Sequence, residues 1–105
     1  MGKIAILAFK PKAGNFELLK RLVLEHYDLL DQQGLVSARM PVVMHNSDDI
    51  IIEIFEWSSD EAAILADMNP VVQQIWQDFE EVAERIPMAQ LPEVNDLCAL
   101  FSPIN

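Results

Sequence analysis

The sequence has little cysteine, little glycine and few basic residues, and each shortage excludes a class of function. Cys98 is the only cysteine, so an intrachain disulfide is impossible and a zinc site built from several cysteines of one chain is excluded. Only 3 glycines occur, and no glycine-rich phosphate-binding loop is present. Because 7 basic residues stand against 17 acidic ones, for a net charge of −10, nucleic acid is not expected as a partner.

Long apolar runs are also missing. The apolar run Ile4 to Phe9 is too short for a signal segment or a membrane span, and the negative charge disfavours an anionic membrane surface. We therefore expect a cytoplasmic protein without membrane contact. The two histidines, His26 and His45, show no metal-ligand spacing, so no metal site is predicted. A chain of 105 residues with 51% hydrophobic residues suits a single domain spanning 1–105.

The stretch Asp48 to Ala63, DDIIIEIFEWSSDEAA, predicts a turn, a buried strand and the start of a helix. β-Branched and aromatic residues occupy both faces of this strand, and Glu53 is the one charge in its middle. Ser58 to Glu61 then offers residues that cap a helix. Both faces of the strand are therefore expected to be covered.

The remaining elements follow from apolar periodicity and from Pro, Gly and Asn signals. We predict strands at Lys3 to Lys10, Ser37 to His45, Ile50 to Trp57 and Leu97 to Phe101, helices at Phe16 to Gln33, Asp60 to Met68 and Pro70 to Ile86, and an irregular segment at Met88 to Asp96. The order β-α-β-β-α-β predicts an α+β, ferredoxin-like fold, with a four-stranded antiparallel sheet and two helices on one face.

The turn Asn46 to Asp49 sets the pairing of its two strands. A symmetric hairpin places Val42 opposite Glu53 and Val43 opposite Ile52. Glu53 would then share a sheet face with Met40, Val42 and Met44. A three-residue loop would shift this register by one position.

An apolar second sheet face predicts an assembly. Two helices cover only one face of such a sheet, and monomers rarely expose a large apolar patch. A second copy of the chain is the simplest cover, so we predict a homodimer formed through the sheet faces.

Two segments resemble a known superfamily. The string Glu53 to Ala63, EIFEWSSDEAA, followed by Ala66 to Pro70, ADMNP, resembles the dimeric α/β-barrel superfamily and its antibiotic-biosynthesis-monooxygenase-like branch. The resemblance implies a ligand cavity between sheet and helices, and oxygenation of aromatic or polyketide-like substrates without a bound cofactor. Haem-degrading members carry a helix histidine where this chain has Asp67, so haem is not implied here.

Glu53 and His26 are the candidate catalytic residues. A carboxylate among apolar neighbours is desolvated and can serve as a base. His26 lies on the apolar side of its helix, where it could act as a proton shuttle or a ligand donor. The alternatives are structural: Glu53 paired with a basic group or water at the dimer interface, and His26 as a core histidine with a backbone partner.

Three further residues are candidates for ligand binding. Trp57 and Trp76 could line an aromatic pocket, although core packing explains them equally well. His45 could contact a ligand, or lie at the surface beside the turn. The resemblance thus implies a small monooxygenase-like enzyme that acts on a small aromatic or polyketide-like substrate without a cofactor. Two alternatives stay open: a non-catalytic dimer that binds a small apolar molecule, or a purely structural dimer.

Overall fold

The chain folds into one antiparallel sheet of five strands with three α-helices, in a computed structural model that describes residues 2–105. The elements are β1 (Ile4–Pro11), α1 (Phe16–Gln32), β2 (Val42–His45), β3 (Ile51–Glu56), α2 (Ala62–Asp67), α3 (Pro70–Val82), β4 (Ala83–Ile86), the short 3-10 helices η1 (Met88–Gln90) and η2 (Pro92–Asn95), and β5 (Ser102–Pro103). The strand order is β4-β1-β3-β2-β5. The α+β class is therefore confirmed, whereas the predicted sheet of four strands is wrong. The short helix predicted at Asp60 to Met68 is present as α2, in addition to the two helices expected on the sheet face.

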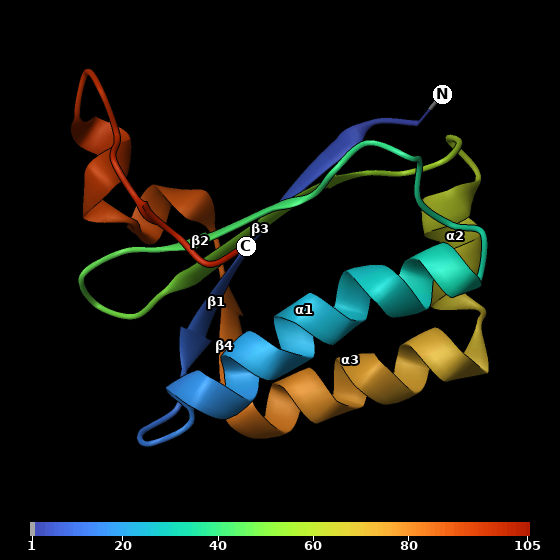
Figure 1. Cartoon of the computed structure of the whole chain (residues 1–105). Coiled ribbons are helices and arrows are strands. Elements are labelled where there is room, and N and C mark those ends of the chain that lie inside the picture. Colours follow the sequence, from blue (N-terminus) through green and yellow to red (C-terminus); the bar gives the residue numbers. More distant parts are fainter. Residues whose placement is uncertain (1) are drawn as a thin grey trace.

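The helices lie against one face of the sheet. Figure 1 shows α1 and α3 side by side beneath the strands, with α2 at one end. Helix α1 turns Leu19, Val23, His26 and Leu30 inward, which is the spacing of one helical face. Helix α3 begins as predicted, because the Asn69 side chain accepts hydrogen bonds from the backbone N–H groups of Val71 and Val72 and Pro70 occupies the first turn.

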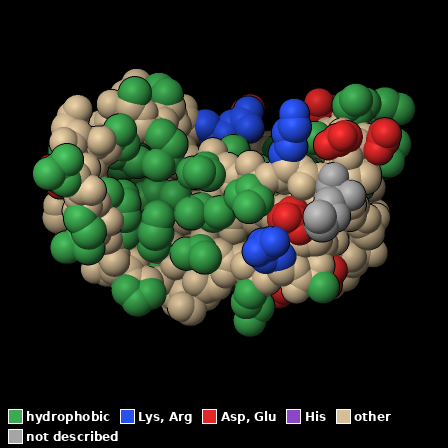
Figure 2. All heavy atoms as spheres, turned by 90° about the horizontal axis from the view of Figure 1, so that it is seen from above, with side chains coloured by type: hydrophobic (Ala, Val, Ile, Leu, Met, Phe, Trp, Pro, Cys, Tyr) green, Lys and Arg blue, Asp and Glu red, His purple; other side chains and the backbone are tan. Residues whose placement is uncertain are grey.

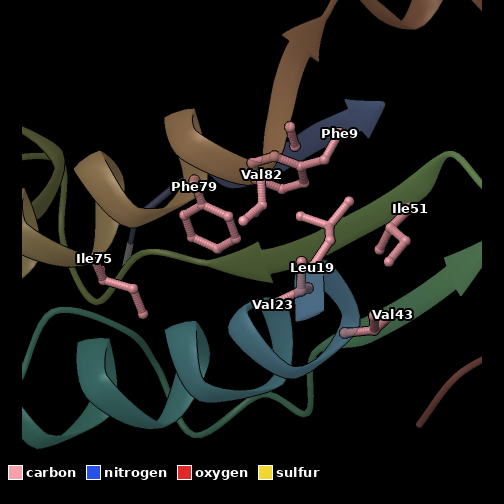
Figure 3. Packing of buried hydrophobic residues seen from close by; sticks show 9 residues of the cluster. Phe9, Leu19, Val23, Val43, Ile51, Ile75, Phe79 and Val82 are labelled. Carbon is pink, nitrogen blue, oxygen red and sulfur yellow. The ribbon is translucent and has the colours of Figure 1, made fainter. Parts of the chain in front are cut away.

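The core fills the layer between these helices and the sheet. Figure 3 shows residues of both helices meeting residues of β1, β2 and β3. The buried hydrophobic members of this cluster are Phe9, Leu19, Val23, Val43, Ile51, Ile75, Phe79, Val82 and Ala83. The rings of Phe9 and Phe79 stack with centroids 4.7 Å apart, so β1 and α3 are joined by direct aromatic packing.

Strand β4 corrects the predicted length of the last helix. The prediction continued that helix to Ile86, but it ends at Val82, and Ala83 adopts an extended conformation. Residues Ala83–Ile86 pair with β1 instead, with Ala83 opposite Pro11 and Ile86 opposite Ala8. Ladder hydrogen bonds to an otherwise open strand edge outweigh the local helix preference of this short segment.

The predicted strand Leu97 to Phe101 is also wrong. This segment has no strand conformation, and Leu97 and Leu100 are exposed. The chain pairs only afterwards, where Ser102 and Pro103 lie opposite His45 and Met44 of β2. The preceding 3-10 helices instead fold over the sheet face that the α-helices leave open, where Leu91 is buried among Ala8, Ile50 and Ile52.

The β2–β3 hairpin is shifted by one residue from the symmetric prediction. Val43 lies opposite Glu53, and Val42 lies opposite Ile54. The Asn46 N–H donates to the Ile50 carbonyl, its side-chain oxygen accepts from the N–H groups of Asp48 and Ile50, and Asp49 takes the left-handed conformation with φ of 64°. This is a three-residue loop, and it therefore puts Glu53 on the face covered by the helices.

The opposite sheet face is only partly covered. Figure 2 shows hydrophobic side chains gathered over this face. Ile4, Ile6 and Val42 are 53%, 51% and 47% exposed, whereas Ala8 and Ile52 are buried beneath the C-terminal segment. In the described part of the chain, none of the helices combines the length and the apolar character that a membrane span requires.

Candidate functional site

Glu53 occupies the middle of the central strand. Its neighbours across the sheet are Leu7 of β1 and Val43 of β2, so the carboxylate is surrounded by apolar side chains. The residue is 0% exposed. A buried carboxylate is stable only when its oxygens receive hydrogen bonds or a positive partner.

His26 of α1 supplies that hydrogen bond. Its Nδ1 lies 2.8 Å and 3.0 Å from the two carboxylate oxygens of Glu53, and the imidazole is 1% exposed. The pair joins the helix layer to the centre of the sheet. The sequence predicted Glu53 and His26 as separate candidates, and the structure brings them into contact.

Trp76 of α3 contacts the other nitrogen of the same ring. Its indole Nε1–H donates to His26 Nε2 over 3.1 Å. An indole nitrogen can only donate, so Nε2 must present its lone pair. The proton of a neutral imidazole then sits on Nδ1 and points at Glu53, which accepts it as a carboxylate. The three residues therefore hold His26 as the neutral Nδ1–H tautomer.

Two phenylalanines fix the orientation of the imidazole ring. Phe55 and Phe79 meet His26 at interplanar angles of 87° and 86°, with ring centroids 5.9 Å and 5.3 Å away. Such edge-to-face packing leaves the ring little freedom to rotate. Both hydrogen-bonding directions of His26 are consequently fixed by its surroundings.

A cavity of about 590 Å³ lies beside this ring. Its floor is apolar and mostly aromatic, and it is formed by Leu7 and Phe9 of β1, Phe55 of β3, and Trp76 and Phe79 of α3. His26 reaches the wall, while Glu53 is not among the lining residues. Glu53 thus holds the imidazole by Nδ1 from outside the cavity, and His26 contributes a polar ring to a mostly apolar part of the lining.

Charged residues of both signs also line the cavity, and they are exposed. Lys12, Arg85, Glu80 and Glu84 contribute to its lining. The Lys12 ammonium donates to the backbone carbonyl of Glu80 over 2.8 Å, which ties the β1–α1 loop to the end of α3. The lining therefore combines exposed charged residues with buried apolar ones, as is usual for sites that bind small organic molecules.

The structure places the other predicted ligand-binding residues elsewhere. Trp57 packs edge-to-face against Phe55 on the side away from the cavity lining, and His45 contacts Phe16 and the Asn46 carbonyl near the turn. Neither lines the cavity of His26. The placement of Glu53 beside Met40, Val42 and Met44 is corrected as well, because the shifted hairpin turns the carboxylate toward α1.

Sequence reasoning missed the partners of the imidazole. The structural alternative gave His26 a backbone partner, but both of its partners are side chains. Phe79 was treated only as core, although it lies three residues after Trp76 and hence on the same helical face. The sequence did offer two signals: a single histidine on the apolar side of a helix and a single charge in a buried strand. Two such groups can satisfy each other's hydrogen-bonding capacity inside a core.

Within residues 2–105, no group of three or more His, Cys, Asp or Glu side chains is arranged to hold a metal ion. Comparison of the chain with protein-family models, with curated proteins and with solved structures found no match.

Proposed function

We propose that this protein binds a small, largely apolar aromatic molecule in the cavity beside His26 and removes a proton from it, with His26 as the general base. The main support for this proposal is the position of His26. The imidazole reaches the cavity wall, and the fully buried Glu53 accepts a hydrogen bond from its Nδ1–H. A carboxylate behind an imidazole stabilises the imidazolium that forms when Nε2 accepts a proton.

The proposed chemistry is that of a cofactor-independent monooxygenase-like enzyme. A CH₂ group flanked by aromatic rings or a carbonyl loses a proton to His26, and the resulting carbanion is oxidised by dioxygen. One oxygen atom remains as a new carbonyl group and the other leaves as water, so the CH₂ group becomes C=O and dioxygen is the only oxidant. The apolar interior supports this step because it excludes water from the carbanion.

The fold and assembly proposed with this function are those of the dimeric α/β-barrel superfamily. The strand order β4-β1-β3-β2 and the helices on one face support a ferredoxin-like arrangement, with β5 as an addition at the edge. The exposed Ile4, Ile6 and Val42 support a homodimer through the opposite face. Light scattering at micromolar concentration tests this, and a monomer of 11.9 kDa would contradict it.

Anthrone, a tricyclic ketone whose CH₂ group lies between two aromatic rings, is a suitable probe for the proton step. In deuterated buffer without oxygen, the protein should accelerate exchange of the CH₂ hydrogens, and oxygen uptake should follow when air is admitted. His26→Gln should abolish the acceleration. His45→Gln is the matched control, because the second histidine lies outside the cavity. Equal exchange with wild type and His26→Gln would contradict the proposal.

A second candidate is a dimer that binds an apolar molecule without transforming it. Trp76 favours this alternative, because its N–H already occupies the lone pair that a base would use. In the anthrone experiment this candidate gives saturable binding without exchange.

A further inference from the structure

We infer that the Trp76 indole acts as an internal substitute for the ligand: it occupies the His26 lone pair in the free protein and is displaced by a proton donor of the bound molecule, which is an O–H or N–H group or the acidic C–H group of the proposed substrate. This inference rests on the proposed function, because it concerns the same cavity. It adds a residue that controls access to the base, and a chemical requirement on the ligand.

Trp76 is the least buried member of the trio. Glu53 and His26 are 0% and 1% exposed, and the imidazole is confined by Phe55 and Phe79. Trp76 is half-buried and lines the cavity, so its ring borders free volume. The indole packs only partly buried against the two core clusters, so its rotation toward the cavity would disturb less packing than a movement of Glu53 or His26.

The hydrogen-bond pattern then restricts what can replace the indole. With Nδ1–H held by Glu53, the Nε2 atom is an acceptor. A ligand that offers only acceptors, such as an ether, ketone or carboxylate oxygen, would place a lone pair against a lone pair. A ligand carboxylate would in addition approach the buried charge of Glu53. The geometry thus selects a neutral aromatic compound that points a proton donor at Nε2: a hydroxyl or amine group, or the acidic CH₂ group of the proposed substrate.

The replacement of the indole by a donor of the ligand also separates specific ligands from compounds that only fill apolar space. Any apolar molecule can fill the aromatic floor, but only a donor restores the hydrogen bond that His26 loses when Trp76 leaves. A buried acceptor left without a partner is unfavourable, so a non-donor is expected to bind while the indole stays in place. Displacement of Trp76 therefore distinguishes a specific ligand from a cavity filler.

The test compares 1-naphthol, which carries a donor, with 1-methoxynaphthalene, which has the same rings and no donor. In wild type, naphthol should shift the Trp76 indole N–H resonance in ¹H–¹⁵N spectra, and methoxynaphthalene should leave it unchanged. Trp76→Phe keeps an aromatic ring and removes the competing N–H. It should tighten naphthol binding about three- to tenfold relative to methoxynaphthalene, the equivalent of one competing hydrogen bond.

Trp57→Phe is the matched control, since Trp57 lies outside the cavity; it also assigns the two indole signals. Imidazole ¹⁵N spectra should show His26 as the Nδ1–H tautomer in wild type and in Trp76→Phe, which confirms that the variant keeps the Glu53 contact. The ratio of the two affinities is the readout, because a purely structural effect of the variant would change both ligands alike.

The outcomes separate this inference from the function on which it rests. Naphthol that shifts the cavity residues Phe9 and Phe79 but leaves the Trp76 N–H on His26 would overturn the inference while small-molecule binding stands. An equal response to both probes would also overturn it. If neither probe binds to wild type or to Trp76→Phe, the inference and the proposed function both fail.

Discussion

Substitution of Glu53 by glutamine should destabilise the fold by an amount that reveals the charge state of its partner. Both carboxylate oxygens of Glu53 accept from His26 Nδ1, and the residue is fully buried. Glutamine keeps the shape but adds an NH₂ group that only donates. If the amide oxygen binds Nδ1–H, the NH₂ group has no acceptor; if the NH₂ group binds Nδ1, the imidazole proton moves to Nε2 and opposes the Trp76 N–H.

Either arrangement buries at least one unsatisfied donor. The expected cost is about 1–3 kcal/mol of unfolding free energy. For 105 residues the unfolding entropy gives about 4–5 °C per kcal/mol, so Tm should fall by about 5–15 °C. If His26 were instead a cation paired with Glu53, the variant would strand a buried charge and the cost would be about 3–5 kcal/mol.

The assay is thermal and urea unfolding followed by circular dichroism at a fixed protein concentration, because dimerisation would make Tm depend on concentration. Glu56→Gln is the control: it lies on the same strand and faces the other side, and its partner Arg39, 3.3 Å away, has a side chain that is 60% exposed. This control should cost at most about 1 kcal/mol. An equal melt for both variants would refute the buried hydrogen bond, and a loss above about 4 kcal/mol would refute the neutral tautomer.

Three further predictions concern the turn, a tyrosine and the open sheet face. Asp49→Val should cost about 1–2 kcal/mol because Asp49 has a φ of 64°, whereas Asp49→Gly should not lower Tm; equal melts would contradict the role of this loop. Burial and the charges of Asp31 and Asp28 raise the pKa of Tyr27 above its unfolded value, so its contribution to stability is complete below about pH 10 and is lost as pH rises further. Tyr27→Phe, which removes the hydroxyl that donates to the Ser37 carbonyl, should lack this alkaline loss in pH-dependent urea unfolding. Ile6→Asp should yield a folded monomer by light scattering, and a retained dimer would show that the open face is not the interface.

The elements that were predictable from sequence are those with a long periodic pattern. Helix α1 and the start of α3 agree with the predicted Phe16 to Gln33 and Asn69–Pro70 signals, because a helical face repeats several times and a cap is a local structure. Strand β3 was recognisable because it is apolar on both faces.

The misplaced elements depend on partners distant in sequence. The segment AERI of β4 contains good helix formers and follows a helix without interruption, so its local preference points the wrong way. The edge of β1 decides its conformation. Likewise, the exposed Leu97 and Leu100 resemble strand residues locally, but only Ser102 and Pro103 reach the edge of β2.

The candidate site was predictable in its members but not in its connections. Glu53, His26 and Trp76 were each identified, while their contact depended on a register that a single residue of loop length controls. The left-handed Asp49 is the deciding feature, and aspartate is among the few non-glycine residues that adopt this conformation readily.

The His26–Glu53 pair also makes the hairpin register specific. In a register shifted by one, Glu53 would point to the open sheet face, among Ile4, Ile6 and Val42, without its imidazole partner. His26 would then lose its Nδ1 acceptor inside the core. The two buried polar groups satisfy each other in only one register. The pair therefore destabilises the register shifted by one residue, even if the pair contributes little net stability to the native fold. The structural role of the pair and its proposed role as a base are therefore compatible, because the packing that fixes the register also keeps His26 in the cavity wall.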